Sequence, residues 1–538
     1  MDRKVKYSAI AVSLLPSALL AGPKKNIGKD APKRPNIVFI MSDDHSYQTI
    51  GCYGHKLIKT PNLDRIAESG LFFRNNFVTN SVSKPSRATI LTGKFTHLNG
   101  QRGVEDGLEF DQLQNTYPKL LQEAGYQTAI VGKWHLGGIP LGFDYYSVHI
   151  GASQQGHYYN PDFLEVDGVH RNEGYATDLT VDKCLEWLKG KRDPAKPFYL
   201  SCHFKAPHRN WMAALKKLDM YEDKTFPLPE NFYDNYDGRI AARMQLAEIG
   251  RDTHLASDFK LWDYQSYNDL PDLVEEYERM TPEQKAEFSR FYAMIQTDFE
   301  NRNLKGDALK EWKYQRFMRD YSKVISSVDD NVGRLIDWLQ GNGLWENTIV
   351  IYTSDQGFMM GEHGWYDKRW MYEETFRSPF LISYPAGLSE NLPKEMAAMI
   401  QNIDYMPTFL DYAGIPVPDD VQGISLRPLL EGRTHETHDA IYYHYYEYPG
   451  FHAVKRHYGC RTDRYKIIRF YYDIDQWELF DLAKDPMEMN NLWNDPGYKD
   501  VQSMMLKKLA ELQVKYKEPD PTDDEYALTV TSQQKCRY

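Results

Sequence analysis

The chain has 538 residues, of which 42% are hydrophobic and 26% are charged, as in folded globular proteins. This composition argues against disorder over most of the chain, and the length favours more than one domain. The formal net charge of −12 argues against a general nucleic-acid binder, which needs a basic face. An anionic substrate would therefore have to bind in a local basic pocket, against the field of the whole protein.

The N-terminus predicts export. MDRKVK is basic, YSAIAVSLLPSALLA is apolar, and a step of small residues follows at Ala21 and Gly22, which is the order of a secretory signal peptide over residues 1–22. A membrane anchor is the alternative, but it needs roughly 20 apolar residues. The run here is shorter and is interrupted by Pro16. We therefore expect a periplasmic or secreted protein with no stable membrane span.

Four short apolar segments each end in polar residues, as buried parallel strands do when their carboxyl ends carry function. In chain order these are PNIVFIMSDD, ending in Asp43 and Asp44; YQTAIVGKWHLG, with Lys133 and His135; KPFYLSCHFKAPH, ending in His208; and NTIVIYTSDQG, with Asp355 and Gln356. Helical patterns such as TYPKLLQEAG and YSKVISSVDDNVGRLIDWLQGNG lie between them. This alternation predicts an α/β sandwich with a mostly parallel central sheet, whose ligand binds at the carboxyl ends of the strands.

Three further regions differ in composition. Residues 213–310 are charged and rich in Tyr, with helical patterns such as TPEQKAEFSRFYAMIQTDF, and are predicted to be a helical insertion on the side of the active site. Residues 440–515 contain hairpin-like strands followed by a helix, which predicts a smaller α+β domain with an antiparallel sheet. The catalytic domain would then span residues 33–430, and residues 516–538 would be a polar tail.

The five cysteines are few, odd in number and widely spaced, and none forms a CxxC pair: Cys52, Cys184, Cys202, Cys460 and Cys536. No disulfide framework is expected, although one oxidised pair is compatible with the spacing. Most of them are expected to be small buried apolar residues.

The acids at the strand ends predict a metal site. Asp43, Asp44 and Asp355 with the amide oxygen of Gln356 are hard oxygen ligands, which suit Ca²⁺ or Mg²⁺. The alternative is that each pair caps a helix or a turn, which is a common use of Asp after a strand. Because both pairs follow apolar strands, we favour the metal site.

The basic residues predict an oxyanion site beside that metal. Lys133 and His135 alternate after a strand, so they share one face if the chain is extended there. With Arg87, His208 and Lys368, they could bind a tetrahedral oxyanion and supply proton donors. Taken singly, each of these residues is more often a surface side chain.

The segment SKPSRATILTG, which begins at Ser83, resembles the signature of the type I sulfatase family. The resemblance extends over about residues 33 to 500 and includes the Asp-Asp pair, G-K-W-H-L, A-P-H, S-D-Q-G, G-E-H-G and a later Lys. It implies an alkaline-phosphatase-like α/β fold with a small C-terminal domain and one Ca²⁺. It also implies that a sulfatase-maturation enzyme, recognising the Ser83 region, oxidises Ser83 to formylglycine.

The resemblance also assigns roles to single residues. Asp43, Asp44, Asp355, Gln356 and residue 83 would bind Ca²⁺, although the family often has Asn or His in place of Gln356. Of the remaining residues, Arg87 would hold the hydrated aldehyde, Lys133 and Lys368 would bind sulfate oxygens, His135 would handle the proton of the second hydroxyl, and His208 would protonate the leaving alcohol. The first hydroxyl attacks sulfur and the second allows sulfate to be expelled. An unmodified Ser has one hydroxyl, so its sulfate ester would be a dead end.

Three segments resemble those of bacterial glycan sulfatases, and most closely N-acetylglucosamine-6-O-sulfatases acting on mucin O-glycans or heparan fragments: SQQGHYYNPDF, the D-K-R triplet and HYYEYPGFHAVKRHYG. This implies that Asp367 and Arg369 hold sugar hydroxyls, with His457 a weaker candidate. A local ion pair between Asp367 and Arg369 is the alternative. Trp211 or Trp365 could stack on a sugar, but core packing is the more common role of such residues.

Other functions stay open at this point. Related sulfatases remove 4-O-sulfate from galactose or N-acetylgalactosamine, or 2-O-sulfate from uronic acid. A phosphatase or phosphodiesterase of the same fold would use Ser83 itself and two Zn²⁺ ions, but no D-x-x-x-H pattern is placed to supply the second set of ligands. A non-catalytic sulfoglycan-binding protein would not need both His135 and His208.

Overall fold

The computed structural model describes residues 34–104, 109–261, 271–448 and 450–520. The predicted signal peptide, Cys536 and most of the predicted tail lie outside these residues. None of the helices in the described ranges is long and apolar enough to cross a bilayer.

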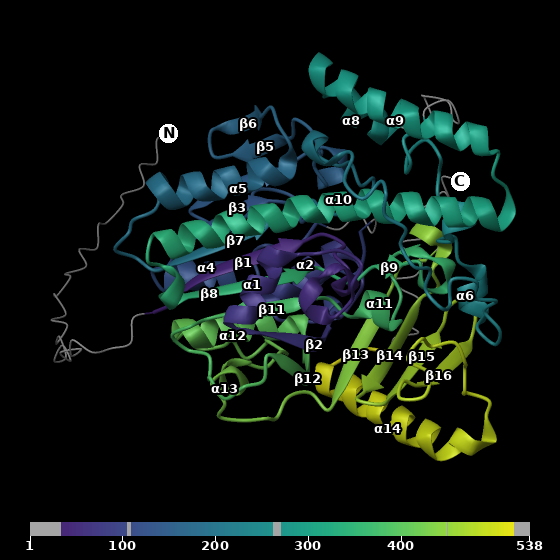
Figure 1. The fold of residues 1–538 in the computed structure, drawn as a ribbon. Helices are drawn as coiled ribbons and strands as arrows, with labels where there is room; N and C mark the ends of the chain where they lie inside the picture. The colour runs from purple at the N-terminus through teal and green to yellow at the C-terminus, as the bar shows by residue number, and fades with distance from the viewer. Residues whose placement is uncertain (1–33, 105–108, 262–270, 449, 521–538) are drawn as a thin grey trace, which may run out of the picture. The chain divides into compact units, whose positions relative to one another are not determined.

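A ten-stranded sheet forms the centre of this structure (Figure 1), in the order β12-β2-β11-β8-β1-β7-β3-β4-β5-β6. The strands are β12 (Glu395–Gln401), β2 (Leu71–Phe77), β11 (Phe380–Ser383), β8 (Thr348–Ser354), β1 (Asn36–Ser42), β7 (Phe198–His203), β3 (Gln127–Gly132), β4 (Tyr145–His149), β5 (Asp162–Glu165) and β6 (Gly168–Arg171). The neighbours from β8 to β4 are parallel, whereas β11 and β5 run against their neighbours. The predicted mostly parallel sheet is confirmed.

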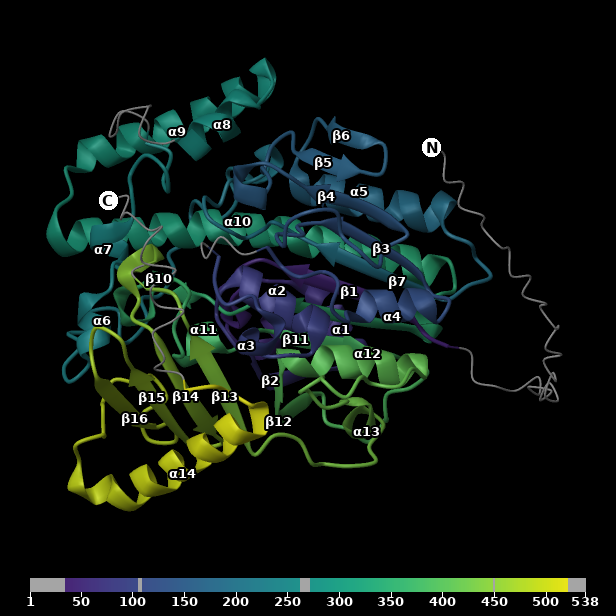
Figure 2. The same cartoon turned by 180° about the vertical axis from the view of Figure 1, so that it is seen from behind.

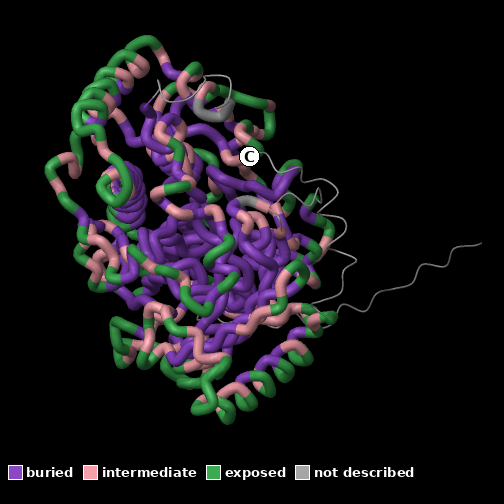
Figure 3. Tube along the Cα trace, turned by 90° about the vertical axis from the view of Figure 1, so that its right-hand side faces the viewer, coloured by how far each residue is buried: buried purple, intermediate pink, exposed green. Residues whose placement is uncertain are grey.

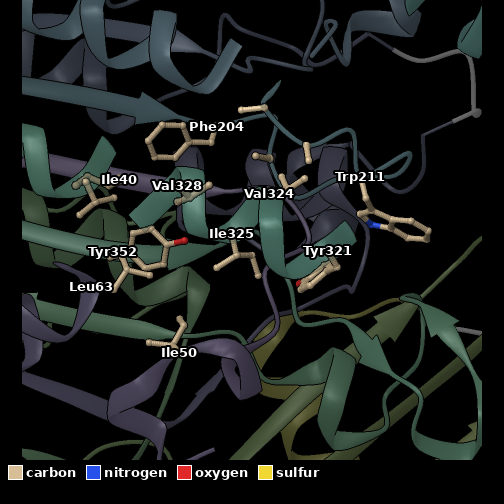
Figure 4. Packing of buried hydrophobic residues seen from close by; sticks show 14 of the residues in the cluster. Ile40, Ile50, Leu63, Phe204, Trp211, Tyr321, Val324, Ile325, Val328 and Tyr352 are labelled. Atoms are coloured by element: carbon tan, nitrogen blue, oxygen red, sulfur yellow. The ribbon is translucent and has the colours of Figure 1, made fainter. Parts of the chain in front are cut away.

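Helices cover both faces of the sheet. Successive side chains of β1 point to opposite faces and all of its residues are buried, so apolar side chains must be covered on each face. Val38 and Ile40 pack in a cluster with α1 (Pro61–Ser69), α5 (Ala176–Glu186) and α10 (Gly306–Gly341). Ile37, Phe39 and Met41 pack with α2 (Ser83–Thr92), α4 (Tyr117–Glu123) and α12 (Tyr405–Ala413). Figure 4 shows the first cluster, in which Val328 of α10 lies near Ile40 and Tyr352 of the sheet. In Figure 3, buried chain is concentrated in this layered region.

The predicted insertion contains short helices and one long helix. They are η5 (Leu215–Lys217), α6 (Ile240–Met244), α7 (Ile249–Asp252), α8 (Pro271–Glu278) and α9 (Pro282–Arg302). A capping box formed by Thr281 and Gln284 begins α9, as the TPEQ sequence indicates. Much of residues 213–248 is irregular, and the long helix α10 begins inside the predicted insertion, at Gly306.

The C-terminal region forms a four-stranded antiparallel sheet, β13 (Ala440–Tyr445), β14 (His457–Thr462), β15 (Tyr465–Phe470) and β16 (Gln476–Asp481). Helix α14 (Lys499–Tyr516) covers one face through Met505, Leu509 and Leu512 (Figure 2). The other face packs against Trp370 and Phe376, which lie in the chain between β10 (Tyr366–Asp367) and β11. The predicted antiparallel sheet is confirmed, and the domain limits 33–430 and 440–515 stay predictions.

The packed structure continues past the end of α14. The Glu518 side chain is 1% exposed, and its oxygens lie 2.6 Å from His97 Nδ1 and 3.1 Å from His444 Nδ1. The predicted polar tail from residue 516 therefore starts within packed structure, because Glu518 contacts two buried histidine side chains.

Candidate active site

The polar ends of four strands meet at one edge of the sheet. Because β8, β1, β7 and β3 are parallel neighbours, residues that follow them lie side by side. Asp43 and Asp44 follow β1, Asp355 and Gln356 follow β8, Lys133 follows β3, and His208 follows β7. The segments that were distant in sequence are thus brought together, as the strand pattern predicted.

Helix α2 brings Ser83 to this edge. Ser83 is its first residue and Pro85 lies in its first turn. Backbone N–H groups there have no partner within the helix, so the missing N–H of Pro85 costs no hydrogen bond. Gly93 ends the helix in the left-handed conformation, with φ of 62°. The Ser86 hydroxyl donates to the carbonyl of Asp355, which fastens the helix to the end of β8. The hydroxyl of Ser83, which is 2% exposed, donates to Asp43 Oδ1 at 2.9 Å.

Three buried carboxylates form a cluster at this site, and one of them accepts from the Ser83 hydroxyl. One carboxylate oxygen from each of Asp43, Asp44 and Asp355 lies within 4.8 Å of the others, and all three residues are fully buried. Gln356 Nε2 donates to Asp44 and lies 3.4 Å from Ser83 Oγ, while its Oε1 is buried without a partner in the described residues. Turning this amide over would present Oε1 to the carboxylates. The donor set, which is made of buried oxygens, fits a hard cation such as Ca²⁺.

Each carboxylate also faces a cationic side chain. Arg87 Nε and Nη2 both lie 3.0 Å from Asp355 Oδ2. Lys133 Nζ donates to Asp43 Oδ2, and Lys368 Nζ lies 2.5 Å from both oxygens of Asp44. Unpaired buried charges are costly, so three cations opposite three carboxylates make the cluster tolerable in the interior. If a metal ion neutralised the carboxylates, Arg87, Lys133 and Lys368 could bind an anionic ligand instead.

Burial shapes the protonation of these groups. It raises the pKa of Asp44 to about 7, whereas the pKa of Asp43, despite the same burial, is held well below its usual value by Lys133 and its other cationic neighbours. Burial also lowers the pKa of Lys133 to about 8. Additional positive charge among these carboxylates would favour their ionised forms.

The two histidines differ in their surroundings. Burial lowers the pKa of both His135 and His208 well below the usual value, so both rings are neutral near pH 7. His208 Nδ1 donates to the carbonyl of Arg209 at 2.8 Å, which leaves Nε2 facing Asp44 at 3.8 Å. An anionic substrate beside this ring would raise its pKa and favour the protonated form that a general acid requires.

His135 reaches the site by a different route from the one predicted. Its φ of 61° is left-handed, so Lys133 and His135 do not alternate on an extended chain, and that part of the prediction is wrong. The two side chains are joined instead by Gln155, which accepts from Lys133 Nζ and lies 2.9 Å from His135 Nε2. Gln155 lies within the SQQGHYYNPDF segment, but its role could not be assigned from sequence, because an irregular turn with no periodic pattern places its side chain.

Asp367 and Arg369 flank Lys368 and are paired with each other. Asp367 lies at the end of β10 (Tyr366–Asp367), which pairs with β9 (Met359–Met360). Its Oδ1 accepts from Arg369 Nη1 at 2.9 Å and from the Lys368 amide at 2.8 Å. His452 Nε2 donates to its Oδ2 at 2.6 Å. The local ion pair therefore exists, and it is part of a larger cluster beside the sulfate-binding candidate Lys368.

His452, and not His457, is the histidine in this cluster. His457 is fully buried in the C-terminal sheet, with its ring 5.9 Å from Trp370 and 5.0 Å from Phe470. Its Nδ1 donates to the carbonyl of Lys455 at 2.7 Å. Two histidines five residues apart cannot be told apart from sequence alone, because their separation in space depends on the loop before β14.

Left-handed backbone conformations gather around the same site. Five non-glycine residues with φ between 61° and 91° belong to the clusters described above: Asp44, His135, Asp367, Arg369 and His452. Such conformations cost roughly 1–3 kcal/mol each and persist where the surrounding structure imposes them, often at functional sites. Trp211 and Trp365, in contrast, are fully buried in hydrophobic clusters and serve as core residues.

Comparisons with known proteins show the family of this chain. A model of the sulfatase family matches residues 35–415, and a model of the N-sulphoglucosamine sulphohydrolase C-terminal region matches residues 361–515. An N-acetylglucosamine-6-O-sulfatase of Bacteroides thetaiotaomicron is 47% identical over 525 residues, which cover 96% of this chain and 93% of that protein. An arylsulfatase of Clostridium perfringens is 29% identical over 521 residues, covering 88% of this chain and 94% of that protein.

Solved structures give the same result. A protein in complex with its substrate D-glucosamine-2-N,6-O-disulfate has a TM-score of 0.88 and 47% identity, with 92% of this chain and 100% of that chain covered. A phosphonate monoester hydrolase of Agrobacterium radiobacter, with a TM-score of 0.64 and 19% identity over 90% of this chain and 96% of that chain, shares the fold alone. Since the family model and a relative of high identity span most of the sequence, this chain belongs to the sulfatase family and is a sulfuric ester hydrolase.

Proposed function

We propose that this protein is an exported carbohydrate sulfatase that removes 6-O-sulfate from N-acetylglucosamine or a related glucosamine in mucin or heparan glycans. The observation that carries the proposal is the 47% identity, over 96% of the chain, to a named N-acetylglucosamine-6-O-sulfatase. The similar structure that binds 6-O-sulfated glucosamine supports the same substrate class.

The residues around Ser83 support two further parts of the proposal, a single Ca²⁺ and a formylglycine made from Ser83 by a maturation enzyme. Asp43, Asp44, Asp355 and Gln356 would hold the cation. Once formed and hydrated, the aldehyde would supply one hydroxyl as the nucleophile and a second for releasing sulfate, and bound Ca²⁺ would supply positive charge. Ser83 already lies at the N-terminus of a ten-residue helix, where partial positive charge favours an anion.

The basic side chains bind and orient the sulfate ester. Lys133 and Lys368 carry ammonium donors on either side of the carboxylate cluster, where they would bind sulfate oxygens. Arg87 holds Asp355 and, through Nη1, the carbonyl of Lys133, so it fixes the relative positions of two strand ends. His208 would give a proton to the leaving sugar oxygen, and His135 would take the proton of the second hydroxyl at residue 83.

The cluster beside Lys368 would hold the sugar. Asp367 and Arg369 are buried and ionic, and His452 presents both ring nitrogens to oxygen acceptors, Asp367 Oδ2 and the carbonyl of Leu246. Buried charged groups next to the sulfate site are suited to hydrogen bonds with sugar hydroxyls. His457 is a weaker candidate, since its ring lies among aromatic side chains.

A screen of defined monosaccharides tests this function. Protein expressed with a maturation enzyme would be assayed on 6-O-sulfated N-acetylglucosamine, on 4-O-sulfated galactose and N-acetylgalactosamine, and on 2-O-sulfated uronic acid, with a phosphate ester as a further substrate. The highest kcat/KM is expected for the 6-O-sulfated sugar. A preference for another sulfate position would replace the proposed substrate, and a preference for the phosphate ester would overturn the sulfatase assignment.

A further inference from the structure

An exposed turn at the edge of the active site has an unusual backbone. Gly151, Ala152, Ser153 and Gln154 have φ values of 82°, 42°, 55° and 68°, all in the left-handed region. For residues other than glycine, this conformation costs roughly 1–2 kcal/mol each. The turn is tied down by Gln154 Oε1, which accepts from the N–H of Gly137 at 2.8 Å.

Glycines at both ends let this turn lie against two buried histidines. A Cβ added to Gly151 would come within 2.7 Å of His157 Nε2. A Cβ added to Gly156, whose φ is 72°, would come within 2.6 Å of His149 Cβ. Real Cβ atoms do not make contacts this short, so a side chain at either position would displace the turn. Packing against the two histidines therefore determines the path of the backbone here.

The turn places the amide of Gln155 between two residues of the active site. Gln155 Oε1 accepts from Lys133 Nζ, and Gln155 Nε2 lies 2.9 Å from His135 Nε2. The orientation of the amide follows from chemistry, because an ammonium group can only donate and therefore requires the oxygen. The amide NH₂ must then face His135.

This contact determines where His135 carries its proton. If the amide donates to Nε2, that nitrogen is an acceptor and the proton of the neutral ring is on Nδ1. Nδ1 is buried and has no hydrogen-bond partner among the described residues. Buried polar atoms of this kind usually have a partner.

We propose that Gln155 is a positioning residue of the sulfatase reaction. It holds the Lys133 ammonium beside the sulfate position and fixes His135 as the Nδ1–H tautomer, and the strained turn from Gly151 to Gly156 keeps its amide in place. This role rests on the proposed function, because it assumes that Lys133 and His135 act on a sulfate ester.

Two substitutions separate the two contacts. Gln155→Leu removes both, whereas Gln155→Glu keeps an acceptor for Lys133 but, when ionised, has no donor for His135. Ser153→Ala is the control, since Ser153 is exposed and lies in the same turn. All proteins would be matured, and rates would be divided by the converted fraction of residue 83, measured by mass spectrometry.

Gln155→Leu is expected to lower kcat by about 10- to 100-fold, as loss of an orienting partner typically does, with a much smaller change in KM. A second readout is independent of turnover: NMR of unmatured protein labelled with ¹⁵N-histidine, with the His135 signal assigned from His135→Asn. The wild-type and Ser153→Ala proteins should show the Nδ1–H form. Gln155→Glu should convert it to the Nε2–H form, because its carboxylate accepts from Nε2.

Wild-type kcat in Gln155→Leu, or an unchanged His135 tautomer in Gln155→Glu, would overturn this role. A wild-type protein that cleaves no sulfated sugar would overturn the proposed function instead, and the NMR comparison would still decide what Gln155 does to His135.

Discussion

The exchange Asp367→Asn tests whether the cluster beside Lys368 recognises the sugar. It preserves the shape of the side chain and removes its charge. The carboxylate accepts hydrogen bonds from the Lys368 amide at 2.8 Å, from Arg369 Nη1 at 2.9 Å and from His452 Nε2 at 2.6 Å. The last two of these contacts hold Arg369 and His452 against Asp367, in the cluster that is proposed to bind the sugar.

The size of the effect follows from these contacts. A hydrogen bond to a charged group contributes about 1.5–3 kcal/mol. If one such bond to the substrate is lost, either from Asp367 itself or from a displaced neighbour, kcat/KM should fall by about 10- to 100-fold. The loss should appear mainly in KM if the sugar is held equally in the ground state and the transition state.

The assay compares kcat/KM on 6-O-sulfated N-acetylglucosamine for wild type, Asp367→Asn and Asp475→Asn. The control removes a carboxylate charge from an exposed ion pair, in which Asp475 lies 3.5 Å from Arg469 and its side chain is 74% exposed. Exposed pairs of this kind contribute little, so the control should match wild type. Unchanged kcat/KM in a folded Asp367→Asn protein would refute sugar recognition and leave Asp367 as a local partner of Arg369.

Three further outcomes follow from the structure. Chelation of divalent cations should abolish activity and lower Tm, and added Ca²⁺ should restore both, because an ion that binds only the folded state stabilises it; unchanged activity and Tm after complete chelation would contradict the metal site. Gly132→Ala should cost more than about 3 kcal/mol of unfolding free energy in a denaturant titration, because its Cβ would lie 1.9 Å from the carbonyl oxygen of His203, whereas Gly54→Ala, with open space around it, should cost about 1 kcal/mol. The pKa of Glu518, which burial would raise, is lowered to about 2 by His444 and His97. This stabilisation should therefore be present above pH 4.5 and lost as the pH falls toward 2, and Glu518→Gln should flatten the dependence of unfolding free energy on pH in that range.

The core of the site could be predicted because its residues are tied to regular elements. Asp43 and Asp355 directly follow apolar strands. Parallel pairing brings the residues after neighbouring strands together, independently of the conformation of the connecting loops. Ser83 and Arg87 are four residues apart on one helix, so they share a face. For these residues, chain order and periodicity are enough.

The surroundings of the site could not be predicted in the same way. Gln155 and His452 come from irregular turns, and His452 reaches Asp367 across 85 positions of sequence. Both depend on left-handed backbone that tertiary packing imposes on residues with no preference for it. The sequence indicates His457 as a weaker candidate and does not point to His452, because the loop that separates them carries no periodic pattern.

The most direct test of the proposed chemistry is the mass of the peptide that contains Ser83, measured on protein of known specific activity. The account predicts that active protein carries this residue two hydrogen atoms lighter than serine, and that activity rises in proportion to the converted fraction. Fully active protein in which every copy of Ser83 is unmodified serine would contradict it.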